Sequence, residues 1–102
     1  MNITEKLLIK HAERKLNKLN INLVHFIPGR IRLQSAIWIQ NKRLIDSITS
    51  RLKSEVLVYD AVFTSATGSL LITYNASYMT NTKKIEEWFL LIQKIYAEEY
   101  GF

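Results

Sequence analysis

The chain has no cysteine among its 102 residues. This absence excludes disulfide bonds, thiolate-held iron–sulfur clusters, cysteine-containing zinc sites and cysteine nucleophiles. The three glycines are scattered, so no glycine-rich phosphate-binding loop is present. No apolar run reaches the roughly 18 to 20 residues of a membrane-spanning helix, and the N-terminal residues do not have the pattern of a signal peptide. We therefore expect a soluble, cytoplasmic protein.

Residues that carry catalysis or bind metals are sparse as well. No nucleophile, base and orienting residue stand at a spacing typical of an enzyme site, so we predict a protein that is not an enzyme and has no cofactor. His11 and His25 are the only histidines, and a lone histidine in a strand is usually just hydrogen-bonded. We therefore predict no metal site. If the protein does bind a metal or haem, His25 is the candidate ligand and Met79 a second one.

The remaining composition is that of an ordinary folded domain. Hydrophobic residues make up 48% and charged residues 23%, and the length suits one domain with a single core. The formal net charge is +5 and the isoelectric point is near 9.6. This positive charge favours acidic partners, which include nucleic acid, an anionic membrane surface and an acidic protein patch.

Residues 4–19 have the pattern of a basic amphipathic helix. Leu8, Ala12, Leu16 and Leu19 recur at helical spacing, while lysines and an arginine occupy the remaining surface. We expect this helix to pack its leucines on the domain. The alternative is a helix that contacts a membrane surface or a partner.

The first predicted strand is long and interrupted. Residues 21–27 are rich in β-branched and aromatic side chains. Pro28-Gly29 predicts a bulge or tight bend, after which the strand resumes over residues 30–34. Strict alternation in the second part predicts two core residues, Ile31 and Leu33, and three residues on the opposite side, Arg30, Arg32 and Gln34.

Two further helices and two further strands complete the pattern. Apolar periodicity predicts a helix over residues 41–54 with Asn41 as its N-cap. Two strands follow at residues 56–64 and 69–75, joined by a short turn. A final amphipathic helix spans residues 82–100.

The order strand, helix, strand, strand, helix predicts an α+β fold, a ferredoxin-like βαββα(β) sandwich with an extra N-terminal helix. A right-handed crossover makes the first two strands parallel with the third antiparallel between them, and the helices cover one face of the sheet. No residues remain for a fourth strand, which leaves the first strand as an exposed edge. The chain could fold back at Pro28-Gly29, the N-terminal helix could shield the edge, or two copies could pair. We favour the last alternative, a homodimer.

Two phrases in the sequence carry a family resemblance. FIPGRIRLQ, from residue 26, and TSATGSLLITYN, from residue 64, resemble segments of the divergent heavy-metal-associated (HMA) domain family. The markers are a Pro-Gly-Arg-x-Arg phrase before the first helix and a Thr-Gly-Ser phrase that opens the third strand. On this basis residues 1–20 form an N-terminal amphipathic helix and residues 21–102 an HMA-like ferredoxin-fold domain, a single domain overall.

The resemblance also implies a function. Familiar HMA domains hold soft metals with a Met-x-Cys-x-x-Cys loop, but the corresponding residues 35–41 contain no thiol. What remains is a non-enzymatic interaction or regulatory module in metal transport or homeostasis, without the CxxC metal site. Because HMA domains often accompany metal-transporting P-type ATPases, such an ATPase is the candidate partner. A haem- or iron-binding module that uses His25 is a third reading.

Three residues are our candidates for partner binding. Arg30 and Arg32 lie side by side on one side of a strand, where carboxylates or phosphates of an acidic partner would offset their charges. As an alternative, the two arginines are simply solvated. Trp38 stands between two isoleucines in an apolar tip that either folds onto the end of the sheet or anchors a contact.

Nucleic-acid binding is the competing function. Ferredoxin-like domains bind single-stranded RNA on the open face of the sheet by stacking bases on aromatic rings. Tyr59 or Tyr74 would supply such a ring here, and the same arginines would hold phosphates. The characteristic phrase of RNA-recognition motifs is missing from the sequence, which favours a protein partner.

Overall fold

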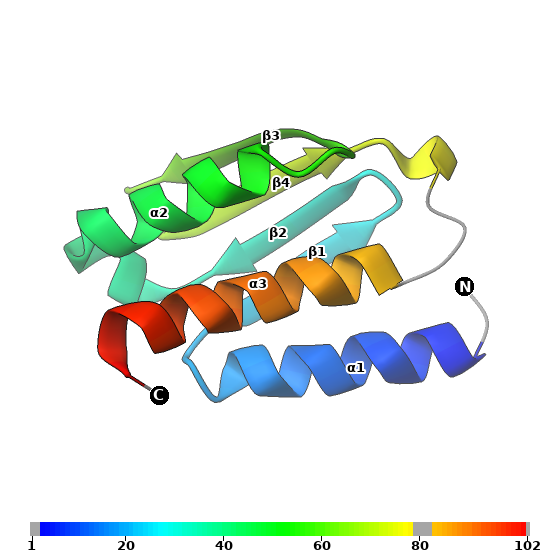
Figure 1. Cartoon of the computed structure of the whole chain (residues 1–102), viewed down its shortest axis with the longest axis horizontal. Coiled ribbons are helices and arrows are strands. Elements are labelled where there is room, and N and C mark those ends of the chain that lie inside the picture. The colour runs from blue at the N-terminus through cyan, green and yellow to red at the C-terminus, as the bar shows by residue number, and fades with distance from the viewer. Residues whose placement is uncertain (1–2, 79–82, 102) are drawn as a thin grey trace.

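The computed structural model of the chain describes residues 3–78 and 83–101. This part forms an α+β structure of three α-helices, four strands and two short 3-10 helices (Figure 1). The α-helices are α1 (Ile3–Asn17), α2 (Lys42–Lys53) and α3 (Lys83–Tyr100). The strands are β1 (Asn22–Ile27), β2 (Arg30–Gln34), β3 (Val58–Thr64) and β4 (Ser69–Tyr74). The 3-10 helices are η1 (Ala36–Gln40) and η2 (Ala76–Tyr78).

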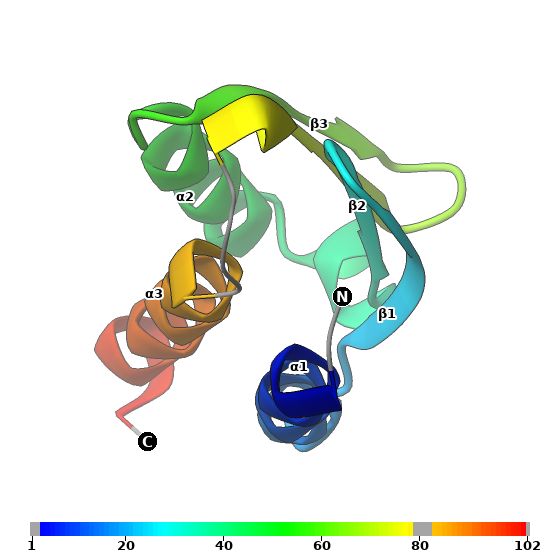
Figure 2. The same cartoon turned by 90° about the vertical axis from the view of Figure 1, so that its right-hand side faces the viewer.

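The four strands form one antiparallel sheet in the order β1-β2-β4-β3. Because β4 is antiparallel to both of its neighbours, β2 and β3 are parallel to each other, as the sequence predicted. The three helices lie on the same face of the sheet, and the other face is left open (Figure 2). This arrangement is compatible with a ferredoxin-like fold.

The prediction of one long first strand is wrong, because its two halves are separate antiparallel strands. β1 and β2 form a hairpin in which Ile27 pairs with Arg30. Pro28 has a fixed φ and lacks an amide hydrogen, and Gly29 adopts a φ of 89°, in the left-handed region. The pair therefore reverses the chain rather than bending it. As a result, β1 covers the edge of β2, where the predicted fold would have its fourth strand.

The hydrophobic core lies between the sheet and the helices. From the sheet it receives fully buried side chains, of which Ile31 and Leu33 come from β2 and Leu70 and Ile72 from β4. Fully burying an aliphatic side chain contributes about 1.5–3 kcal/mol to stability. The alternation predicted for β2 is thus confirmed, since Arg30 and Arg32 are exposed beside these buried neighbours.

The N-terminal helix packs on the domain. α1 contacts α3 and β1, and Ile9, Ala12 and Leu16 are buried on that side. In α2, the predicted cap is confirmed, because the Asn41 side chain accepts a hydrogen bond of 3.2 Å from the Leu44 amide. None of the helices in the described part of the chain combines the length and the hydrophobicity needed to cross a bilayer.

Candidate functional site

The open face of the sheet is built from every second residue of β2, β3 and β4 and, across a register shift in β1, from three residues of that strand. The pairing register aligns these residues in three cross-strand rows. From β1 to β3, the rows are Ile27–Arg30–Thr73–Asp60, His25–Arg32–Leu71–Val62 and Asn22–Gln34–Ser69–Thr64. We call these residues the open sheet face. It places both predicted arginines near the centre of the sheet, on β2.

The charges on the open sheet face are not balanced. Neither Arg30 nor Arg32 has a carboxylate within ion-pair distance among the residues that the structure describes. The only carboxylate on this face is Asp60, two strands away from Arg30, which is roughly 9–10 Å at the usual strand spacing. Asp60 is also engaged elsewhere: its Oδ1 accepts a hydrogen bond of 2.9 Å from the Ala61 amide and lies 3.6 Å from Lys53 Nζ. The centre of the face is therefore positive.

A shallow hollow of about 290 Å³ lies beside Arg32 on this face. Val62 and Leu71 give it an apolar floor, and its remaining lining comes from Arg32, Thr64, Thr67 and Ser69. The Thr67 and Ser69 hydroxyls share a hydrogen bond of 2.9 Å, and Thr67 Oγ1 also lies 3.5 Å from the Thr64 carbonyl oxygen. A guanidinium and hydroxyl donors around an apolar floor form a site suited to a carboxylate or phosphate.

The turn that supplies Thr67 is held against the end of β2. Gly68 has a φ of 69°, and its carbonyl accepts a hydrogen bond of 3.0 Å from the Ser35 amide. A Cβ at this position would lie 2.7 Å from the Ser35 carbonyl oxygen. Only glycine fits this contact without a shift of backbone. The Thr-Gly-Ser phrase therefore meets the end of the strand that carries the Pro-Gly-Arg phrase, a proximity that the sequence did not reveal.

The structure removes Trp38 from the candidate contact residues. Its side chain is fully buried, and its Nε1 donates a hydrogen bond of 2.9 Å to the Tyr96 hydroxyl. The ring also packs edge-on against Phe63, with centroids 6.5 Å apart. The 3-10 helix η1 turns Trp38 inward and leaves the flanking Ile37 and Ile39 exposed. Of the two alternatives for this residue, the structure shows the one in which it folds onto the end of the sheet.

The two tyrosines proposed for base stacking differ in position. Tyr74 is buried against Trp88, with ring centroids 5.2 Å apart, and this burial raises its pKa while a hydrogen bond with the Gly29 backbone opposes the rise. It points away from the open face and cannot stack on a base. Tyr59 is 69% exposed, at a register shift between Val58 and Asp60 near the start of β3.

Comparison with protein families identifies one family that the chain matches. The chain matches the family model described as heavy metal associated domain 2 over residues 6–97. The protein belongs to this family. No curated protein and no solved structure matches the chain. The match begins within α1 and ends within α3, so it includes all of α2 and most of the other two α-helices. With no cysteine in its sequence, the protein is a cysteine-less heavy metal associated domain.

In this heavy metal associated domain, the residues around His25 do not suit a metal ligand. His25 is exposed on β1, and its cross-strand partner is Arg32. A guanidinium at this position repels a cation and attracts an anion. Within the described residues, no three His, Asp or Glu side chains gather in a group that could hold a metal ion. Met79, the second candidate ligand, lies outside the described residues.

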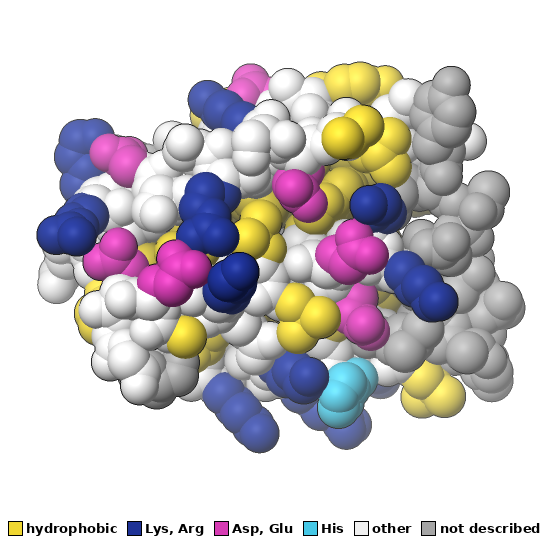
Figure 3. Space-filling model, in the orientation of Figure 1, with side chains coloured by type: hydrophobic (Ala, Val, Ile, Leu, Met, Phe, Trp, Pro, Cys, Tyr) yellow, Lys and Arg dark blue, Asp and Glu magenta, His cyan; other side chains and the backbone are white. Residues whose placement is uncertain are grey.

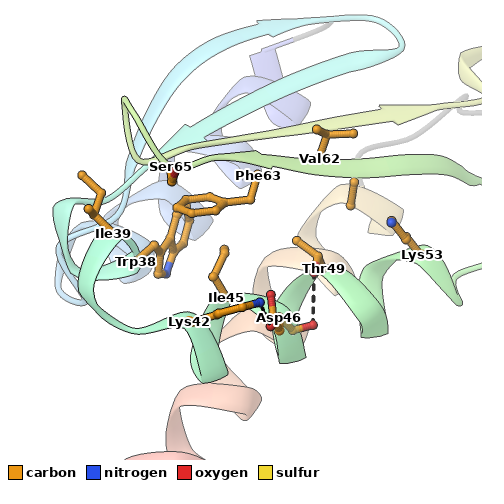
Figure 4. A pocket seen from close by; sticks show the side chains of 11 residues that line it. Trp38, Ile39, Lys42, Ile45, Asp46, Thr49, Lys53, Val62, Phe63 and Ser65 are labelled. Atoms are coloured by element: carbon orange, nitrogen blue, oxygen red, sulfur yellow. Dashed lines mark hydrogen bonds and ion pairs between the residues drawn. The ribbon is translucent and has the colours of Figure 1, made fainter.

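Sequence reasoning missed a second hollow of this domain, a groove of about 540 Å³ between α2 and β3 (Figure 4). Ile45 and Phe63 line its apolar part. At its rim, Lys42 Nζ lies 2.6 Å from an oxygen of Asp46, so these two charges offset each other. The groove joins residues that are distant in sequence, and only the packing of α2 on the sheet brings them together.

Proposed function

We propose that this heavy metal associated domain is a non-enzymatic docking or regulatory module that binds an acidic protein segment on its open sheet face. Family membership supports a metal-associated role at the level of the family. We further propose a ferredoxin-like fold in which β1 takes the place of the fourth strand. The cysteine-less sequence supports a docking role rather than thiolate-mediated metal transfer.

The observation that carries this proposal is the unbalanced pair of arginines beside the hollow. Arg30 and Arg32 are two residues apart on a strand, so their Cα atoms are separated by about 7 Å. An extended acidic segment with carboxylates at alternate positions has the same repeat. One carboxylate would meet Arg30, and the next would enter the hollow at Arg32 with hydroxyl donors beside it. Guanidinium groups bind carboxylates with two parallel hydrogen bonds, which favours arginine at such a site.

The partner follows from the same chemistry. We propose an acidic segment of a cytoplasmic protein, with a metal-transporting P-type ATPase as the candidate suggested by the resemblance to HMA domains. Apolar side chains of the segment would rest on Val62 and Leu71, which are accessible in the floor of the hollow. Mixed apolar and charged contacts of this kind give both affinity and selectivity for an acidic strand.

A fluorescence anisotropy titration tests the proposal. The probe is a labelled peptide of alternating glutamate and threonine, and the same peptide with glutamine in place of glutamate is the reference. We expect the acidic peptide to bind and the glutamine peptide to bind at least tenfold more weakly, since hydrogen bonds to charged groups contribute about 1.5–3 kcal/mol. The double variant R30Q/R32Q should lose this preference.

The matched control is K10Q/K18Q, which removes two exposed positive charges on α1, away from the sheet. It should bind the acidic peptide like the wild type. Equal losses in the two double variants would mean that affinity follows net charge alone. Tighter binding to a labelled single-stranded RNA than to the peptide, lost in R30Q/R32Q, would instead establish the nucleic-acid alternative.

A further inference from the structure

The outward side of α1 carries a stripe of exposed cations. Leu7, Lys10, His11, Arg14 and Lys18 are all exposed on it. Their spacing of three and four residues places them on one side of the helix, and a backbone hydrogen bond from the Lys18 amide to the Arg14 carbonyl continues the helical turn to Lys18. We call these five residues the α1 stripe. The opposite side of the helix is buried against the domain.

Five of the seven cations on α2 and α3 lie in ion pairs with described residues, whereas those of the α1 stripe do not. Five carboxylates lie within 2.6–3.6 Å of Lys42, Arg43, Arg51, Lys53 and Lys84. In the described part of the chain, Lys10, Arg14 and Lys18 have no such ion pair. Figure 3 agrees with this contrast: blue and magenta side chains alternate over α2 and α3, while blue side chains gather along the lower rim, where α1 lies.

The N-terminal segment of the sequence also carries more positive than negative charges. Residues 1–20 contain five lysines and arginines against two glutamates, a surplus of three out of the net charge of +5. Lys15 is half-buried and lines a small hollow together with Glu86 of α3. His11, at the margin of the α1 stripe, lines the same hollow. The exposed cations among the described residues of this segment are Lys10, Arg14 and Lys18.

We propose that the α1 stripe is an electrostatic contact for an anionic lipid bilayer. Lys10, Arg14 and Lys18 follow one another at about 6 Å along a straight helix, so all three can meet a flat array of lipid phosphates together. Leu7, which is 64% exposed among these cations, contributes an apolar contact at the interface. Because Ile9, Ala12 and Leu16 are already buried, the helix rests on the bilayer without inserting its apolar side, and binding is reversible.

Two features favour lipid over nucleic acid as the polyanion. The α1 stripe presents no Phe, Tyr or Trp side chain on which a base could stack, and its single ring is the imidazole of His11. An exposed leucine among the cations gains nothing from a phosphate backbone but is accommodated at the boundary between lipid headgroups and acyl chains. The site lies on α1, separate from Arg30 and Arg32, so it is independent of the proposed binding of an acidic segment.

Cosedimentation of the full chain with lipid vesicles tests this inference. The vesicles are phosphatidylcholine alone or phosphatidylcholine mixed with phosphatidylserine. We expect binding to the mixed vesicles only, and its loss between about 0.05 and 0.5 M salt through screening. The variant K10Q/R14Q/K18Q should bind more weakly by about fivefold for each cation removed. Because all three side chains are exposed, the variant should keep the melting temperature of the wild type.

The matched control is K42Q/K53Q/K84Q, which lowers the formal net charge from +5 to +2 just as the first triple variant does. It should retain most vesicle binding, and so should R30Q/R32Q. Equal losses in the two triple variants, or binding to phosphatidylcholine alone, would overturn the inference. So would tighter binding of the wild type to a DNA duplex than to mixed vesicles at the same salt, with loss in K10Q/R14Q/K18Q.

Discussion

Trp38 and Tyr96 are separated by 58 positions in the chain, yet they share a buried hydrogen bond of 2.9 Å. The sequence indicated an apolar tip around Trp38 but not its direction, because a 3-10 helix of five residues has no long periodic pattern to read. The partner on α3 is equally hidden from local inspection. At the scale of single residues, long-range polar contacts such as this one are what the sequence fails to predict.

Tyr96 gives a testable pH dependence. Burial raises the pKa of Tyr96 to about 12, while the hydrogen bond from Trp38 opposes the rise. In the unfolded chain a tyrosine ionises near pH 10. The protonated hydroxyl therefore stabilises the fold fully below pH 10, and this contribution is lost as the pH rises from 10 to about 12.

The substitution Tyr96→Phe isolates that contribution. At neutral pH it leaves the buried Trp38 Nε1–H without its acceptor, which should lower the free energy of unfolding by about 1–3 kcal/mol. The difference from the wild type should shrink between pH 10 and 12, because the variant has no Tyr96 hydroxyl to ionise. Urea unfolding at a series of pH values measures both effects. The control Tyr59→Phe, at an exposed position, should change little, and a constant deficit of the Tyr96 variant at all pH values would contradict this account.

Among the elements, β2 is where sequence and structure agree most closely. Alternation alone predicted which residues of β2 face the core, because one buried face requires an apolar residue at every second position. The pairing of β1 with β2 by a fold-back at Pro28-Gly29 was one of three alternatives for the exposed edge and not the favoured one, since the sequence of a strand does not state its neighbour. The Pro-Gly-Arg and Thr-Gly-Ser phrases of the family each supply one glycine that holds an end of the β2–β4 pair. The carbonyl of Gly29 accepts a hydrogen bond of 3.1 Å from Tyr74, and that of Gly68 one of 3.0 Å from Ser35. Together they close both ends of the central β2–β4 pair.

The two glycines should differ in their tolerance of a side chain. Both have positive φ, 89° at Gly29 and 69° at Gly68, so alanine at either position costs about 1–2 kcal/mol. A Cβ at Gly68 would also approach the Ser35 carbonyl oxygen to 2.7 Å, whereas at Gly29 the nearest atom is 3.5 Å away. We therefore expect Gly68→Ala to lower the urea midpoint clearly more than Gly29→Ala. Equal midpoints for the two variants would show that the backbone at residue 68 relaxes freely.

For the whole molecule, the surplus positive charge is distributed over two surfaces. α2 and α3 carry ion pairs, whereas Arg30 and Arg32 on the open sheet face and the cations of the α1 stripe form none with the residues that the structure describes. The sequence predicted the sign of the charge and the arginines of β2. It did not predict the hollow beside Arg32, because its lining comes from β2, β3, β4 and the turn before β4. A site assembled from several strands depends on their order in the sheet, which only the folded chain reveals.

Homodimerisation remains a prediction, and the structure changes where it would occur. The edge of β2 that first suggested it is covered by β1. At the free edge of β3, the Asp60 carboxylate accepts a hydrogen bond from the Ala61 amide and lies near Lys53. A charged residue there disfavours pairing with another strand. At the β1 edge, Val24 and Ile27 are 56% and 45% exposed, and an apolar strand edge favours association. We therefore expect two copies to pair through β1.

Sedimentation velocity at tens of micromolar protein provides the test. The wild type should sediment with twice the monomer mass of 11.9 kDa. Val24→Lys, which places a charge at the β1 edge, should return the protein to a monomer. Val56→Lys is the matched control, because Val56 is also exposed but lies outside the strands. If the wild type is a monomer, or if Val24→Lys remains a dimer, the β1 edge is not a dimer interface, and the irregular register at Leu23 and His25 suffices to protect it.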